Sequence, residues 1–179
     1  MSDTQLQYVP QSEGHISPFG MAVDAMHVTA TAADDALFGE MNGWYAVRVT
    51  VRSGHAERTD DAEMAAQVTQ LARRLFVART REYYRLMEVH LQPNPVSLRR
   101  SRDHLEGSVE DKQVSGYADS GAVEVTSIGM KEFIVQLQPG TCARLGSDGL
   151  GAALTSAANE MVAAWLLVLA DYKQQLWSR

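Results

Sequence analysis

Residues 114–137 read VSGYADSGAVEVTSIGMKEFIVQL, and this stretch decides the fold class. Apolar and β-branched residues dominate three short segments, as is typical of strands. These segments are residues 114–118, 122–127 and 132–137. Residues 119–121 (DSG) fill the first gap and Gly129 lies in the second, and such residues favour tight turns. The pattern predicts three strands in sequence, joined into an antiparallel sheet.

The same pattern occurs earlier in the chain. Residues 28–51 also have strand character, and Tyr45–Val51 (YAVRVTV) alternates as a half-buried strand does. Asn42 and Gly43 precede it and tolerate the positive φ of a hairpin turn. A shift of 86 residues aligns five identical residues within 24 positions. The pairs are Val28/Val114, Ala32/Ala118, Ala36/Ala122, Gly43/Gly129 and Val49/Val135. The repeated order of strands, turn and helix predicts an internal duplication.

A long helix is predicted after each set of strands. Asp60 and Glu63 have the spacing of a capping box, and an apolar stripe follows to about His90. The second helix is predicted from about Leu150 to Trp177, after a glycine-rich loop. We therefore expect an α+β protein with two tandem βββα halves, in which each antiparallel sheet carries one long helix.

The second helix contains the most apolar segment of the chain, Met161–Ala170 (MVAAWLLVLA). A surface helix shows only an apolar stripe, whereas this segment is apolar on all sides. One interpretation is a central helix that is covered within the domain. The other is an oligomer interface formed by Trp165, Leu166 and Leu169.

Composition and the positions of proline and glycine predict how the chain is organised. We expect an irregular N-terminal arm over residues 1–26, halves over 27–90 and 113–179, and a linker or loop over 91–112. The N-terminal residues lack the basic start and apolar run of a secretory signal. The longest apolar run has ten residues, against roughly 20 for a membrane span. The single cysteine fits a reducing compartment, so we expect a cytoplasmic protein without a membrane partner.

Motifs that carry catalytic chemistry are missing from the sequence. The five histidines lack the spacing of helical metal ligands, and Cys142 stands alone. The segment Gly146–Gly151 (GSDGLG) precedes a helix, but its glycine spacing fits no phosphate-binding motif and Asp148 would repel an anion. We therefore expect no enzyme activity, no cofactor, no metal and no small-molecule substrate.

The net charge of −6 is unevenly distributed along the chain. Residues 1–63 carry −7, residues 73–102 carry +6 and residues 103–179 carry −5. All eight bases of the middle block are arginines, whose planar fork suits phosphate and carboxylate. The candidate binding residues are Arg73, Arg74, Arg81, Arg85, Arg99, Arg100 and Arg102. A solvated helix face, pairing with the protein's own acids, or contact with DNA or an acidic protein would each explain the block.

The second half resembles the YbaB/EbfC family of small nucleoid-associated proteins. The resemblance rests on residues 114–126 (VSGYADSGAVEVT), Gly129, residues 134–139 (IVQLQP) and the Ala-rich helix from Ala152. In that family a small-residue turn precedes a Val-x-Val strand, and a strand that ends near proline leads to a long helix. The first half looks like a diverged copy, so the resemblance implies a YbaB-like pseudo-dimer within one chain.

The resemblance also carries an expected function. Family members are usually dimers without enzyme activity, and several bind DNA, which implies a homodimer that contacts DNA through the arginine block. The chain is also similar to YbaB-like actinobacterial proteins associated with type VII secretion. That similarity implies the alternative of a cytoplasmic accessory or chaperone-like factor, for which the arginines would meet an acidic protein.

Overall fold

The computed structural model describes residues 17–90 and 107–177. The first half consists of α1 (Pro18–Asp24), β1 (His27–Ala32), β2 (Leu37–Asn42), β3 (Ala46–Val51), η1 (Ala56–Arg58) and α2 (Asp61–His90). The second half contains β4 (Gln113–Ala118), η2 (Asp119–Gly121), β5 (Val123–Ile128), β6 (Glu132–Leu137) and α4 (Thr141–Trp177). The protein is α+β, and the predicted tandem βββα arrangement is confirmed.

Each half forms its own three-stranded antiparallel sheet, with the strands in sequence order. The registers of the two sheets correspond at an offset of 86 residues: His27 pairs with Asn42, and Gln113 pairs with Ile128. The first turn in each sheet also repeats, because residues 33–35 and 119–121 all have positive φ. The two sheets therefore share one backbone design, although few of their residues are identical.

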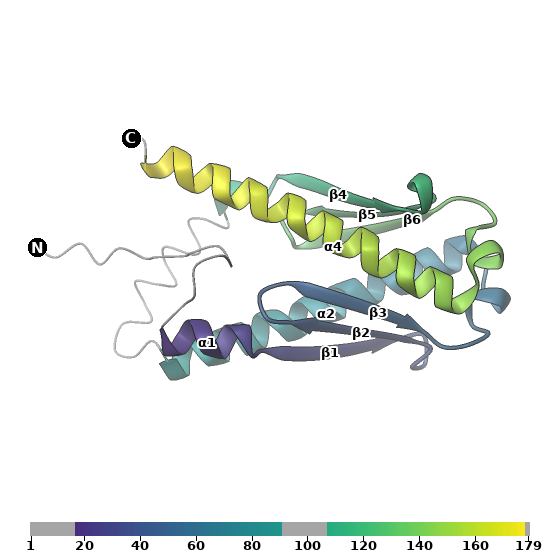
Figure 1. Cartoon of the computed structure of the whole chain (residues 1–179), viewed down its shortest axis with the longest axis horizontal. Coiled ribbons are helices and arrows are strands. Elements are labelled where there is room, and N and C mark those ends of the chain that lie inside the picture. The colour runs from purple at the N-terminus through teal and green to yellow at the C-terminus, as the bar shows by residue number, and fades with distance from the viewer. Residues whose placement is uncertain (1–16, 91–106, 178–179) are drawn as a thin grey trace, which may run out of the picture.

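The two halves interlock instead of lying side by side (Figure 1). Helix α2 packs on β1 and β2 of its own half and on β6 of the other half. Helix α4 packs in the equivalent way on β4 and β5 and on β3 of the first half. Both sheets and both helices supply residues to one apolar core. The chain thus forms one pseudo-two-fold unit, and neither half has a complete core without the other.

A short helical segment precedes each sheet, and the first one corrects the irregular arm expected over residues 1–26. Helix α1 lies within residues 1–26, which we expected to be irregular. It forms because the Ser17 hydroxyl accepts the Gly20 amide, Pro18 begins the first turn and Val23 is fully buried. In the expected linker 91–112, the residues next to β4 likewise include a helical turn that buries Val109. Val109 lies at the position equivalent to Val23, so both sheets are preceded by a helical segment.

Helix α4 begins at Thr141 and not at about Leu150 as predicted. Its first turn is separated from the rest by Gly146, whose φ of 64° and ψ of −178° break the helical geometry. The first turn is held by the other half, because both carboxylate oxygens of Asp61 accept backbone amides, from Gly140 and Cys142. A local sequence pattern does not contain this distant cap, so the glycines alone suggested a loop.

The predicted oligomer interface lies mostly inside the chain. Trp165 and Leu169 are 5% and 9% exposed and belong to the core, and Leu166 is partly buried against it. These side chains are covered by the two sheets, which corrects the interface interpretation and favours a central helix. Thr141–Tyr172 is long and apolar enough to cross a membrane by composition, but 44% of its most apolar window is buried. Core packing accounts for that burial.

Candidate functional site

Helix α2 presents the predicted arginines on its outer face. Arg73, Arg74 and Arg81 are exposed, and with Val77 and Ala78 they line a shallow open hollow of about 330 Å³. Residues spaced by four and seven lie on one side of a helix, so the three guanidinium groups share a surface roughly 12 Å long. We call Arg73, Arg74, Val77, Ala78 and Arg81 the α2 arginine face.

The three arginines of this face have no carboxylate partner in the part of the chain that the structure describes. Within residues 17–90 and 107–177, no acid lies at ion-pair distance from Arg73, Arg74 or Arg81. Arg74 donates from Nη1 to the backbone carbonyl of Thr31 at 2.7 Å, which fixes it beside the edge of β1. Because a carbonyl leaves the guanidinium charge uncompensated, all three side chains remain available to an external anion.

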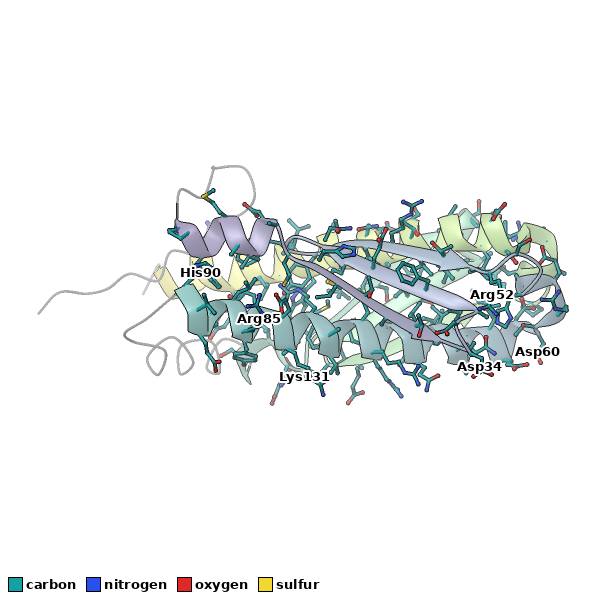
Figure 2. All side chains as sticks on the ribbon, turned by 90° about the horizontal axis from the view of Figure 1, so that it is seen from below. Asp34, Arg52, Asp60, Arg85, His90 and Lys131 are labelled. Atoms are coloured by element: carbon teal, nitrogen blue, oxygen red, sulfur yellow. The ribbon has the colours of Figure 1, made fainter. Side chains whose placement is uncertain are left out.

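Arg85 differs from its neighbours because it is paired. Its Nη2 and Nε donate to the two carboxylate oxygens of Glu82 at 2.6 and 2.8 Å. This pairing lowers the pKa of Glu82 and raises that of Arg85. Figure 2 shows Arg85 toward the end of α2, whereas Asp34, Arg52 and Asp60 gather near its start. The remaining predicted residues, Arg99, Arg100 and Arg102, lie outside the described residues.

Arg79 belongs to the basic block but not to the surface. It is only 2% exposed, its Nε donates to the carbonyl of Trp44 at 3.0 Å, and its guanidinium lies 4.0 Å from the centre of the Tyr45 ring. The sequence contained a signal for this position, because residue 79 continues the spacing of Leu71 and Leu75 along the buried stripe. Arg79 therefore has a structural role, and the exposed basic surface is smaller than the block suggests.

The equivalent face of α4 has a different chemistry. At an offset of 86 residues, Arg73, Arg74 and Arg81 correspond to Asn159, Glu160 and Leu167. The two faces still perform the same structural task at the sheet edges. The Arg74 guanidinium donates to the carbonyl of Thr31, and the Glu160 carboxylate accepts the equivalent Tyr117 amide at 2.6 Å. The arginine surface thus occurs in one half only, although both helices have the same place in the fold.

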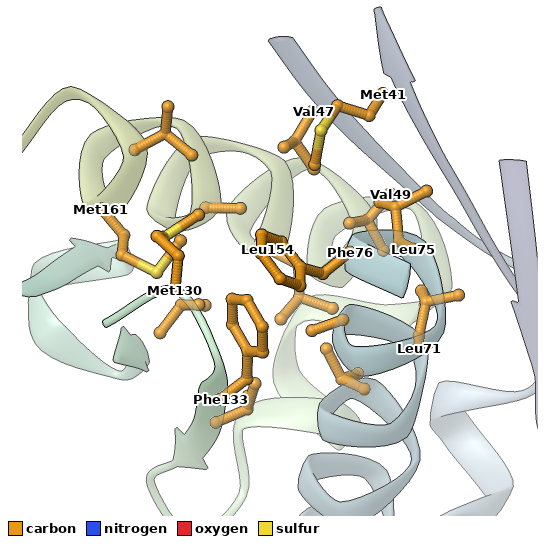
Figure 3. Close-up of a pocket in the computed structure, with 16 residues that line it drawn as sticks. Met41, Val47, Val49, Leu71, Leu75, Phe76, Met130, Phe133, Leu154 and Met161 are labelled. Carbon is orange, nitrogen blue, oxygen red and sulfur yellow. The ribbon is translucent and has the colours of Figure 1, made fainter. Parts of the chain in front are cut away.

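An apolar cavity of about 50 Å³ lies between the halves (Figure 3). Both halves line it, among others through Phe76 and Leu75 of α2, Phe133 of β6 and Leu154 of α4. All of its lining side chains are apolar, so it provides no group for acid–base or nucleophilic chemistry. Such small apolar cavities are usually dry packing defects.

The remaining candidate groups are engaged within the chain. Cys142 is buried, and burial together with Asp61 raises the pKa of its thiol to about 12, so the reactive thiolate is scarce at neutral pH. At the start of the GSDGLG segment, the amide and hydroxyl of Ser147 donate to Glu57. Among the described residues no cluster of three or more His, Cys, Asp or Glu has the geometry of a metal site.

Comparisons with known proteins do not assign this chain to a family. The chain matches no family model, no curated protein and no solved structure. The YbaB-like resemblance therefore stays a prediction.

Proposed function

We propose that this protein is a non-enzymatic, YbaB-like cytoplasmic binding protein that contacts DNA phosphates through the α2 arginine face. The observation that carries the proposal is the set of three exposed arginines, Arg73, Arg74 and Arg81, without carboxylate partners among the described residues. Guanidinium groups bind phosphate oxygens through two parallel hydrogen bonds, and phosphate contacts supply most non-specific DNA affinity.

The duplicated helix supports a function for this surface. A solvated helix face accepts charge of either sign, and α4 has the acid Glu160 at the position equivalent to Arg74. The arginines of α2 are therefore not required by the fold, apart from the Thr31 contact of Arg74. The acidic remainder of the chain disfavours indiscriminate coating of DNA and confines the contact to this face. Arg99, Arg100 and Arg102 extend the basic sequence beyond α2, and we expect them to add phosphate contacts.

The test is a fluorescence-anisotropy titration of labelled duplex DNA at several salt concentrations. We expect the combined substitutions Arg73→Ala, Arg74→Ala and Arg81→Ala to weaken binding at low salt. The slope of log K against log salt is negative, and each lost phosphate contact makes it shallower by about 0.9, so its magnitude should decrease by roughly 3. No binding by the parent protein at low salt, or an unchanged slope, would refute the proposal.

A matched control distinguishes the loss of the α2 arginine face from a mere change in net charge. Arg48, Lys112 and Lys131 are exposed and each lies within 4 Å of a carboxylate, Glu40, Asp111 and Glu110 respectively. Their combined replacement by alanine changes the net charge by the same amount as the α2 variant. We expect it to leave the salt slope unchanged, because these bases lie outside the proposed surface.

A second candidate is an accessory or chaperone-like factor of type VII secretion that binds an acidic protein through the same face. The observation that favours it is that the exposed guanidinium groups of Arg73, Arg74 and Arg81 fit carboxylate oxygens as well as phosphate oxygens. The secretion context itself rests on the resemblance. A pull-down from native lysate that recovers an acidic protein with the parent chain but not the triple variant, together with no DNA binding, would favour this alternative.

A further inference from the structure

The outer surface of α4 carries an apolar stripe that residues 17–90 and 107–177 leave uncovered. Leu167 is 71% exposed, and Ala163 and Ala170 lie on the same side of the helix at spacings of four and three residues. No charged residue occurs between Glu160 and Asp171. We call Glu160, Ala163, Leu167 and Ala170 the α4 outer stripe.

The first half shows that the fold does not require this stripe. The positions equivalent to Glu160, Ala163, Leu167 and Ala170 are Arg74, Val77, Arg81 and Tyr84. An exposed arginine thus stands on α2 where α4 has its exposed leucine. Since both helices occupy the same place relative to the two sheets, core packing explains neither the leucine nor the loss of charge around it. A partner outside the chain would explain both.

We propose that a second copy of this chain covers the α4 outer stripe, with the two α4 helices packed antiparallel about a two-fold axis near position 165. This arrangement places Leu167 of each copy against Ala163 of the other, a large side chain on a small one. It also places Glu160 against Ala170 and separates the two Glu160 carboxylates. A parallel pair would instead bring the two Glu160 carboxylates together and leave Ala163 facing Ala163, so charge and size both favour the antiparallel pair.

The α2 arginine face is a poorer occupant of the stripe. It would bury Arg81 and Arg73 against Leu167 and Ala163, and an unpaired buried charge is strongly unfavourable. Figures 1 and 2 place α2 and α4 on opposite sides of the two sheets, so an α4 contact between copies leaves both α2 faces open. The dimer is therefore independent of the proposed DNA contact. One helix pair is small for an interface, and we expect a dissociation constant of about 1–100 µM.

Disulfide trapping tests the geometry directly. Ala163→Cys and Leu167→Cys variants of the full chain, carrying different tags, are mixed and oxidised; the native Cys142 is buried and 2% exposed. The antiparallel pair brings residue 163 of one copy near residue 167 of the other, within the short Cα separation that a disulfide needs. We expect a covalent dimer in the mixture and little in either variant alone. Efficient self-linking of each single variant would show a parallel pair and overturn the proposal.

Sedimentation equilibrium tests the affinity. We expect Leu167→Glu to raise the dissociation constant at least roughly ten-fold, because it adds a second acid to each side of the interface. The matched control is Ile134→Glu, at an apolar residue 44% exposed on the outer face of β6, which should leave the dimer unchanged. The triple arginine variant should also dimerise normally, so failure of DNA binding and failure of dimerisation are distinguishable. A parent chain that stays monomeric at 200 µM would overturn the proposal.

Because α4 is apolar, a lipid surface is the alternative partner for the α4 outer stripe. Co-sedimentation with vesicles of phosphatidylcholine and phosphatidylglycerol distinguishes the two. We expect no binding by the parent chain. Vesicle binding that is lost in Leu167→Glu would assign the stripe to a lipid surface and refute the second copy.

Discussion

The hydroxyl of Thr155 on α4 accepts a 2.9 Å hydrogen bond from the backbone amide of Val49 on β3, which belongs to the other half. The equivalent Thr69 accepts the amide of Val135 on β6 at 3.2 Å. Each hydroxyl donates in turn to the carbonyl four residues earlier in its own helix. Each of these threonines accepts one edge amide from the sheet of the other half, so part of an open strand edge becomes an interior contact between the halves.

Replacing Thr155 by valine should therefore weaken the contact between the halves. The substitution keeps the shape but leaves the Val49 amide without its acceptor, and we expect a loss of about 1–2 kcal/mol in the free energy of unfolding by urea. Thr50→Val, an exposed position on the same strand, is the control and should change stability by less than about 0.5 kcal/mol. Equal effects of the two substitutions would contradict a role for the Thr155 hydroxyl.

The strands and α2 were predictable because their signals are local. The turn at Asn42 and Gly43, the cap at Asp60 and the periodic stripe of α2 each lie within a few residues of the element that they define. In the structure Asp60 indeed accepts the amide of Glu63 at 2.8 Å. The offset of 86 residues was also visible, and it places the hydrogen bonds of the two halves in register.

The start of α4 and the contacts that bury Arg79 were not predictable from local signals. The first turn of α4 depends on Asp61, about 80 residues earlier, which no pattern around Gly140 or Gly146 reveals. The spacing of Leu71 and Leu75 extends to Arg79 and not to Arg81, but it does not reveal what Arg79 contacts, the Trp44 carbonyl and the Tyr45 ring. Contacts between residues far apart in the sequence thus determine where α4 begins and how Arg79 is bound.

Substitutions of Arg79 and Arg81 should have different effects on the stability of the fold and on DNA binding. Arg79→Ala removes the donor to the Trp44 carbonyl and the stacking on Tyr45, and we expect a loss of about 2–4 kcal/mol in the free energy of unfolding. Arg81→Ala changes an exposed side chain, so its stability should remain within about 0.5 kcal/mol of the parent protein. Urea denaturation and DNA titration of both variants provide the check. A folded Arg79→Ala protein that lost DNA affinity would show that Arg79 also supports the binding face.

The acid sensitivity of the fold should depend on Glu57 and Asp61. Hydrogen bonds from Ser147 lower the pKa of Glu57, and the Cys142 and Gly140 amides lower the pKa of Asp61 despite its burial. Because both folded-state pKa values are depressed, their stabilisation is complete above the unfolded values of about 4 and is lost as the pH falls below them. Urea midpoints measured from pH 6 to 3 should therefore fall less steeply in Asp61→Asn than in the parent protein.

The control for this pH dependence is Glu132→Gln. The Glu132 carboxylate is exposed and accepts no hydrogen bond within the part of the chain that the structure describes, so this variant should keep the acid response of the parent protein. An Asp61→Asn variant with the same steepness as the parent would show that the two cross-half caps do not contribute to acid unfolding.

Gly116 on β4 marks a close approach of α4 to its own sheet. A Cβ atom there would lie 2.0 Å from the carbonyl oxygen of Ala157 and 2.3 Å from the nitrogen of Met161, both in the backbone of α4. The equivalent residue in the first half is Ala30, so α2 leaves room for a methyl group that α4 does not. Since backbone cannot rotate away as a side chain can, Gly116→Ala must push α4 off its sheet.

We expect Gly116→Ala to cost at least about 3 kcal/mol in the free energy of unfolding, at the upper end of overpacking effects. Gly107→Ala is the matched control, because a Cβ at residue 107 meets nothing within 4 Å, and it should be neutral or slightly stabilising. Urea denaturation monitored by tryptophan fluorescence checks both, since Trp165 lies on α4 and reports its displacement. A Gly116→Ala protein with the stability and fluorescence of the parent would show that α4 can shift without loss of core packing, and that the tight β4–α4 contact is not needed for the stability of the second half.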